Sequence, residues 1–424
     1  MAASNMSDGT DGGDEPKWSL IGPGLLVAAT GVGAGDLVAA LVAGSRYGLN
    51  FVWAIVLGVA VKFALNEGVG RYHLATGETF LEGIDSLGRW ATGFFGGYTV
   101  IWGFVYGAAV AASCSLAANA LFPSIPFWVY VVVHPIAGCA LVLLNRYETF
   151  EKIITAFVSL MFVSVIGSAV LVLPQLGDII ATGIPALPEG SVVYALGLVG
   201  GAGGTITMAS YGYWLAEKDW NSPRHIPTMR LDASSAYIIT GIFSIALIVM
   251  SAALLYGTGA SVSGEEGLIV LASNLGNELH PLLRTGFLVG FWAASFTSLL
   301  GVWHGVSYLF ADFVETVTEE TIKPADESEL SGTKWYKFYV LWLTFPPMLL
   351  YFFGRPVFLI VLYGALGALI MPFLAVVLLL LLNSDTVSPG RRNHWLSNSM
   401  LVISALIFLA LMVVQVSELL SGGG

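Results

Sequence analysis

The chain has 424 residues, of which 56% are hydrophobic and only 11% are charged, and its mean hydropathy is +0.80. Soluble domains carry about 25% charged residues, so most of this chain must be solvated by lipid. The net charge of −11 argues against nucleic acid as a partner. The two cysteines, Cys114 and Cys139, lie in apolar segments, so we expect buried thiols and no disulfide.

The first 18 residues are polar and acidic, and they predict a disordered cytoplasmic tail. They lack the basic and then apolar pattern of a signal peptide. Residues 19–424 predict a single transmembrane domain, because apolar runs of about 20 residues follow one another to the end of the chain. We expect an all-α integral membrane protein with about eleven spans, at 19–43, 50–70, 92–121, 126–144, 150–173, 192–215, 234–259, 282–311, 336–353, 356–382 and 397–419.

The cations fall unevenly between the loops of this arrangement. With the N-terminus inside, thirteen of the 17 lysines and arginines lie on inner loops, and only Arg46, Arg284 and Arg355 lie on outer ones. An excess of cations marks the cytoplasmic side of a membrane protein. The pattern predicts a multi-pass protein of the cell membrane with a cytoplasmic N-terminus. The remaining cation, Lys62, falls inside the second span.

Glycines interrupt the first and sixth spans, which read ATGVGAGDLVAA at 29–40 and GLVGGAGGTITMAS at 197–210. Non-helical backbone at membrane depth persists only where it lines a cavity or is buried in protein. Paired broken spans point to a transporter's binding site, and these two are five spans apart, as an inverted repeat of five plus five requires. The alternative is that the glycines only allow helices to pack closely. The glycines that we assign to the two breaks are Gly31, Gly33, Gly35, Gly203 and Gly204.

Three ionisable residues inside the spans need a reason to be there. A carboxylate near mid-bilayer costs at least about 2.5–3.5 kcal/mol, so Asp36 predicts a cation ligand or a protonatable group, or an N-cap for the second half of the broken helix. Lys62 would pair with Asp36 or Glu67, stand in for a coupling cation, or lie in a water-filled vestibule. His304 would be a packing histidine or a proton relay.

Several segments resemble the NRAMP divalent-metal transporters. IGPGLLVAATGVGAGDLVAALVAGSRYG is similar to their first span, with its GPG, DPGN and AGAQYG elements. RYHLATGETFLE resembles the RLGxxTG element that closes their second span, and GTITMAS lies at the position of their metal-binding GATVMPH segment. The resemblance covers about 19–382. It implies a LeuT-like fold of ten core helices plus one extra helix at about 397–419, with the substrate between broken helices 1 and 6.

This chain departs from the family's signature at the ligand positions. Gly33 lies at the position of the family's metal-ligating aspartate, and Asp36 lies at that of its asparagine, so the carboxylate has moved by three residues. Met208 lies at the position of the metal-binding methionine, and Thr205 at that of the residue whose carbonyl helps to coordinate. Ser210 lies at the position of the family's proton-carrying histidine. A serine hydroxyl does not titrate, so Ser210 cannot carry protons in this way.

The leading hypothesis is a transporter that moves a divalent metal cation by alternating access. A thioether favours Mn²⁺ or Fe²⁺ over Mg²⁺ and Ca²⁺, although Mg²⁺ stays open. Asp36 and Met208 would be ligands, helped by carbonyls near Gly33 and Thr205 and by the Ser210 hydroxyl. The metal ion would be the substrate, and no cofactor is expected.

Transport would be uncoupled from protons, or coupled through Asp36, Glu67 or His304. Two other functions stay open. One is transport of a small organic molecule such as an amino acid, with Lys62 replacing a coupling cation, and the other is a non-transporting membrane sensor. An enzyme is not expected, because the sequence has no nucleophile–base set, Walker loop or HExxH motif. Beyond the lipid bilayer and the metal ion, no protein partner can be inferred.

Overall fold

The computed structural model describes residues 22–144, 147–189, 191–201, 203–258, 266–318, 327–353 and 356–420, and these ranges contain helices but no strand. The predicted tail at 1–18 lies outside the described residues. Each of the eleven predicted spans coincides with a helix or with a set of shorter helices. In chain order these are α1 (Pro23–Gly31) with α2 (Ala34–Tyr47), α3 (Val52–Thr76), α5 (Arg89–Leu121), α6 (Phe127–Leu144), α7 (Tyr147–Val172), α8 (Val192–Gly201) with η4 (Ile206–Ser210) and α9 (Tyr211–Ala216), α10 (Ile226–Leu255), α12 (Pro281–Thr318), α13 (Lys334–Thr344) with η7 (Pro346–Phe353), α14 (Pro356–Leu382) and α15 (Trp395–Leu420).

Seven helices in the described ranges are long and apolar enough to cross a membrane. The first and sixth spans are not among them, because each is broken into shorter helices. The breaks fall where the glycine clusters predict them. Two short α-helices lie between spans, α4 (Phe80–Ser86) after α3 and α11 (Glu266–Glu278) before α12, and 3₁₀ segments such as η3 (Gly177–Gly183) lie between other spans.

Three helices extend well beyond the spans that hydropathy predicts, and one of them is α3, which ends at Thr76 rather than near residue 70. α10 begins at Ile226 rather than near residue 234, and α12 continues to Thr318 rather than ending near residue 311. Pro227 lies in the first turn of α10, where a missing amide hydrogen costs nothing. Hydropathy marks the part of a helix that crosses the bilayer, and these helices continue past it as partly polar turns.

The segment ATGETFLE forms the junction between α3 and α4. Gly77 closes α3 in the left-handed region, at φ 77°, and donates its amide to the His73 carbonyl at 2.8 Å. Thr79 and Glu82 then form a capping box at the start of α4, each side chain bonding the other's amide. The glycine and the threonine of this element are therefore helix-end signals.

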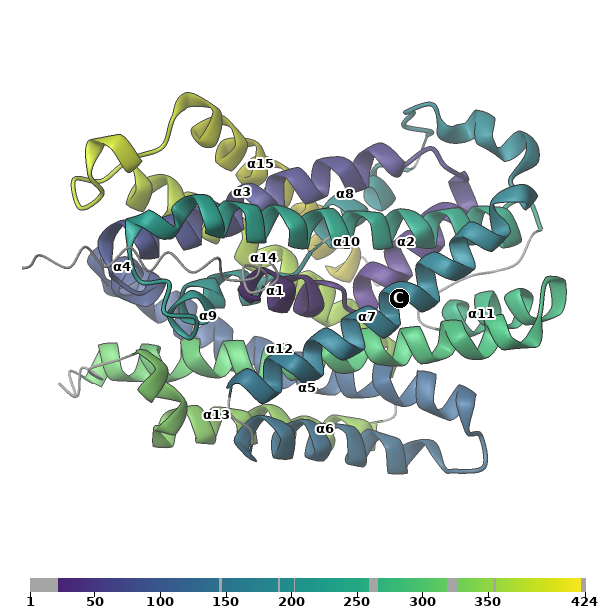
Figure 1. Cartoon of the computed structure of the whole chain (residues 1–424), viewed down its shortest axis with the longest axis horizontal. Coiled ribbons are helices and arrows are strands. Elements are labelled where there is room, and N and C mark those ends of the chain that lie inside the picture. Colours follow the sequence, from purple (N-terminus) through teal and green to yellow (C-terminus); the bar gives the residue numbers. More distant parts are fainter. Residues whose placement is uncertain are drawn as a thin grey trace, which may run out of the picture.

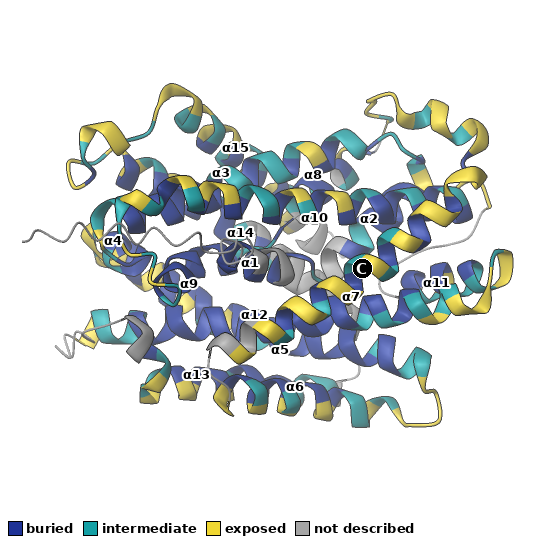
Figure 2. Ribbon diagram, in the orientation of Figure 1, coloured by how far each residue is buried: buried dark blue, intermediate teal, exposed yellow. Residues whose placement is uncertain are grey.

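Figure 1 shows α1 in the interior of the bundle, where it packs against α10 on one side and α12 on the other. In Figure 2 the described residues of this interior are mostly buried, whereas exposed residues lie on outer surfaces such as that of α6. Exposed side chains on α6 include Val132, Val133 and Ile136. Apolar side chains on the outer surface are expected where lipid rather than water surrounds the protein. The chain is a multi-pass membrane protein whose first span is placed at the core.

Candidate substrate site at the two helix breaks

The breaks in the first and sixth spans contact each other through their backbones. α1 ends at Gly31, and a Cβ atom built there would lie 2.7 Å from the carbonyl carbon of Gly203 and 2.9 Å from the amide nitrogen of Gly204. No side chain fits in that space. Gly203 and Gly204 also have φ values of 92° and 83°, in the region that glycine adopts readily. The glycines therefore both break the helices and allow them to touch. Broken spans and close helix packing, the two alternatives from the sequence, thus hold together.

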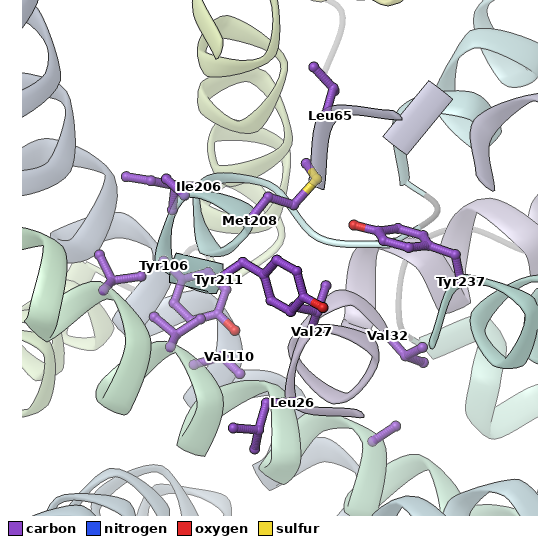
Figure 3. Packing of buried hydrophobic residues seen from close by; sticks show 14 of the residues in the cluster. Leu26, Val27, Val32, Leu65, Tyr106, Val110, Ile206, Met208, Tyr211 and Tyr237 are labelled. Atoms are coloured by element: carbon purple, nitrogen blue, oxygen red, sulfur yellow. The ribbon is translucent and has the colours of Figure 1, made fainter. Parts of the chain in front are cut away.

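The segment after the second break carries the predicted ligands Thr205 and Met208. It forms η4, whose Met208 amide donates to the Thr205 carbonyl at 3.2 Å. Met208 is fully buried. In Figure 3 its thioether points toward Leu65 of α3, and Tyr237 of α10 lies nearby. A single 3₁₀ turn therefore presents the Met208 thioether in the interior.

The carbonyl groups at the second break accept hydrogen bonds from two other helices. Lys62 of α3 is fully buried, and its ammonium donates to the carbonyl oxygen of Gly204. Tyr237 of α10 donates its hydroxyl to the carbonyl oxygen of Gly203 at 3.3 Å. The sequence singled out Lys62 but missed Tyr237, because an aromatic residue in an apolar helix gives no signal by itself. The Lys62 ammonium lies at the second break and does not extend toward the membrane surface.

The first break has polar neighbours from α12 and α5 that sequence reasoning also missed. A Cβ atom at Gly33 would lie 3.3 Å from the hydroxyl oxygen of Ser298. Ser298 donates to the Thr30 carbonyl at 3.1 Å, and its oxygen lies 2.8 Å from the Tyr106 hydroxyl. Thr30 is in the last turn of α1, where carbonyls lose their helical donors. Gly33, at the position of the family's aspartate, thus lies beside the hydroxyl groups of Ser298 and Tyr106.

Asp36 is described only in its backbone, as are Ala34 and Gly35 before it. Its backbone is the third residue of α2, and the amide of Leu37 donates to the Gly33 carbonyl at 3.2 Å. The prediction that Asp36 is the N-cap residue is wrong, because helical backbone begins two residues earlier. The expected contacts of the Asp36 side chain lie outside the described residues and stay predictions.

Glu67 lies in a cluster of charged residues in the C-terminal half of α3. Its carboxylate pairs with Arg71 at 3.0 Å and with Arg230 of α10 at 2.8 Å. The prediction that Lys62 pairs with Glu67 is therefore wrong, because both arginines take that carboxylate. Arg71 also donates to the Arg391 carbonyl at 2.8 Å. This cluster joins α3 and α10 to the segment before α15.

His304 and Ser210 lie where α9 and η4 meet α12. The Nδ1 atom of His304 accepts a hydrogen bond from the Trp214 indole at 3.1 Å. A Cβ atom at Gly305 would lie 3.1 Å from the Ser210 hydroxyl oxygen. Ser210 is fully buried, and its hydroxyl makes no hydrogen bond with any residue in the described ranges. An orphan hydroxyl of this kind is available to a ligand.

A buried carboxylate holds the other end of α1. Asp232 of α10 accepts the amides of Gly22 at 3.1 Å and Gly24 at 2.6 Å, and it also accepts the Tyr211 hydroxyl at 2.8 Å. The first amides of a helix have no helical acceptor, so a carboxylate there satisfies them. Asp232 was not predicted as a site residue. It ties the start of α1 to the start of α9.

Within the described ranges, no group of three or more His, Cys, Asp and Glu side chains could hold a metal ion. A cation between the breaks would therefore depend on Asp36 together with neutral sulfur and oxygen donors. Such a site has a low ligand charge, and Lys62 adds a positive charge beside it.

Comparisons with known proteins agree with this architecture. The family described as "Natural resistance-associated macrophage protein-like", or Nramp, matches residues 24–418. A divalent metal cation transporter, MntH, of Chromohalobacter salexigens is 24% identical over 285 residues, which cover 61% of this chain and 62% of that protein. An uncharacterised protein of Pasteurella multocida is 23% identical over 164 residues, covering 38% of this chain and 37% of its own. The chain thus spans less than two thirds of either relative.

Solved structures resemble the whole bundle. An Eremococcus coleocola manganese transporter superposes with a TM-score of 0.77 at 16% identity, covering 96% of this chain and 89% of that one. MhsT, solved in complex with L-phenylalanine, gives a TM-score of 0.58 at 14% identity, covering 92% and 97%. These likenesses confirm the predicted LeuT-like fold with broken helices 1 and 6. From the match over 24–418, the chain belongs to the Nramp family.

Proposed function

We propose that this chain is a transporter of the cell membrane that carries divalent metal cations by alternating access, through a site between the two helix breaks. The direct backbone contact between Gly31 and Gly203 is the observation that supports this most. It brings together two helix ends whose terminal amides and carbonyls are not used up by helical hydrogen bonds. Such paired ends form the midplane site of transporters built on inverted repeats.

The ligands would be the Asp36 carboxylate, the Met208 thioether, the hydroxyl of Ser210 and carbonyls near Gly33 and Thr205. Met208 supports a softer ion such as Mn²⁺ or Fe²⁺, because its sulfur is buried in the turn next to the break. The orphan hydroxyl of Ser210 supports its inclusion. The metal ion is substrate in this proposal, and the chain needs no resident cofactor.

The charge of Lys62 affects both the binding of such a cation and the coupling of its transport. A divalent cation about 4 Å from an ammonium is repelled by about 8 kcal/mol at the effective dielectric constant of a partly buried site. The Asp36 carboxylate offsets that repulsion in part, and the ammonium takes the place of a separate coupling cation. Ser210 cannot carry protons in the manner of the family's histidine. We therefore propose transport that does not move protons along the family's usual route.

The orientation with a cytoplasmic N-terminus gains support from the arginines at one end of the bundle. Arg71, Arg230 and Arg391 come from three different loops that the sequence assigns to the inner side. The structure gathers them around Glu67 and the segment before α15. An arrangement that placed any one of these loops outside would separate the cluster across the membrane.

A second candidate function is transport of a small organic molecule with a carboxylate, such as an amino acid. The Lys62 ammonium at the break favours it, because a fixed cation attracts a carboxylate and repels a metal ion. The Ser298 and Tyr106 hydroxyls beside Gly33 would supply polar contacts.

Uptake into proteoliposomes separates the two functions. Wild-type protein should take up Mn²⁺ in preference to Ca²⁺, and Met208→Ala should reduce Mn²⁺ uptake about tenfold while changing Mg²⁺ uptake less. Met250→Ala is the matched control, because Met250 is equally buried but lies near the C-terminal end of α10. Absence of metal uptake and metal binding in the wild type, together with uptake of a labelled amino acid, would establish the second function instead. A pH-sensitive dye in the lumen reports proton movement in the same vesicles.

A further inference from the structure

Helix α3 follows the broken sixth span from the break to the start of α9. Lys62 donates to the carbonyl oxygen of Gly204 at the break. Eight residues later, a Cβ atom at Gly70 would lie 2.9 Å from the ring of Tyr211, the first residue of α9. Residues four apart form one row along a helix surface. The row that contains Lys62 and Gly70 therefore faces the sixth span on both sides of η4.

Asn66 lies midway in this row, four residues after Lys62 and four before Gly70. Its level along α3 is thus that of η4, which connects Gly204 to Tyr211. Figure 3 agrees, because the Met208 thioether of η4 points toward Leu65, the neighbour of Asn66 on α3. The structure places this turn of α3 beside the turn that carries the thioether.

The Asn66 carboxamide is fully buried in the interior. Neither its nitrogen nor its oxygen makes a hydrogen bond with any part of the chain that the structure describes. Burying a polar group without a hydrogen bond costs free energy, and the cost applies to both atoms here. Buried polar groups in folded proteins are nearly always paired, so an orphan pair beside a site points to a ligand.

We propose that Asn66 is a cargo-binding residue, whose carboxamide oxygen contacts the divalent cation or a water molecule that the cation retains. This rests on the proposed function. A carboxamide oxygen suits Mn²⁺ as a neutral hard ligand. Its neutrality also fits its position one turn from Lys62, where a second carboxylate would form an ion pair and be lost to the cargo. Asn66 would thus supply from α3 a hard oxygen ligand in addition to the soft sulfur of Met208.

Calorimetric titration of purified protein with Mn²⁺, together with thermal unfolding without metal, tests this role. Asn66→Leu keeps the branched shape of the side chain at a somewhat larger volume and removes both orphan atoms. We expect it to bind Mn²⁺ about tenfold more weakly or worse, since a hydrogen bond or contact to a charged group is lost. We expect its midpoint of unfolding to equal or exceed that of the wild type, because the buried unpaired amide is gone. Asn274→Leu on α11, away from the breaks, is the control.

The outcomes separate this inference from the function on which it rests. Wild-type Mn²⁺ affinity in Asn66→Leu, with a lowered midpoint of unfolding, would assign the amide a purely structural role and overturn the inference alone. No Mn²⁺ binding by the wild type would overturn the metal-transport proposal and the inference with it. If the leucine variant does not fold, Asn66→Ala is measured in the same way, because the smaller side chain cannot clash with η4.

Discussion

The ammonium of Lys62 and the carbonyl oxygen of Gly204 form a hydrogen bond at the point where the sixth span stops being helical. The carbonyl end of a helix carries partial negative charge, and a cation there is stabilising. Lys62 comes from α3, which is continuous through this level of the bundle. A fixed positive charge is thereby supplied to the break by a helix that is not itself broken.

Replacing Lys62 with methionine should raise the affinity for Mn²⁺ about tenfold. Removal of a like charge lowers the electrostatic cost of bringing a cation to the break. The same variant should unfold more readily, because the Gly204 carbonyl loses a donor, at a cost of about 1–3 kcal/mol. Calorimetry and thermal unfolding measure the two effects. Lys62→Arg keeps the charge and serves as the control, and equal Mn²⁺ affinity in all three proteins would contradict the repulsion that we infer.

Adding one methyl group at Gly31 should abolish uptake. The Cβ atom of Gly31→Ala would lie 2.7 Å from the Gly203 backbone, which cannot move aside as a flexible side chain would. The two breaks would be forced apart. Gly197→Ala in α8 is the matched control, because, apart from the backbone of its own helix, no described residue lies within 4 Å of a Cβ atom there. Alanine is a better helix former than glycine by about 1 kcal/mol, so this control should be slightly more stable and fully active. Uptake by Gly31→Ala at the wild-type rate would refute the tight contact.

Neutralising Asp232 should loosen the start of α1. Asp232→Asn keeps the shape of the side chain but weakens its charge-assisted hydrogen bonds to the amides of Gly22 and Gly24. We expect faster hydrogen–deuterium exchange over Pro23–Gly31, with an opening free energy lower by about 1–3 kcal/mol. Asp178→Asn, at an exposed position in the 3₁₀ segment Gly177–Gly183, should leave that exchange unchanged. Identical exchange in both variants would mean that packing alone holds α1.

Much of this architecture can be predicted from the sequence, because the bilayer imposes a length and an apolar composition on every span. The glycine clusters around Gly31 and Gly203 also locate the breaks, since few other residues adopt the backbone found there. Helix limits are harder to predict, as α10 and α12 illustrate. Their outer turns are partly polar and leave no trace in a hydropathy profile.

The contacts within the site could not be predicted in the same way. Lys62 and Gly204 are 142 positions apart, and Ser298 and Thr30 are 268 apart. Such pairs depend on how whole helices pack, which no local pattern encodes. The one signal that was present is the type of residue: Lys62 stood out because an ammonium in an apolar span requires a partner. Asn66 and Tyr237 carry no charge, so nothing in their surroundings along the chain marked them.

The covalent attachment of Lys62 has an electrical consequence. A coupling ion that travels with the cargo adds its charge to every cycle, whereas a lysine contributes charge to the site but cannot cross the bilayer. A divalent ion carried by this protein alone would therefore move two charges per cycle. At a membrane potential of 100 mV that movement is worth about 4.6 kcal/mol, enough to concentrate the ion by about three orders of magnitude. The voltage across the membrane would then be the driving force, and reversing its sign in vesicles would reverse the direction of net flux.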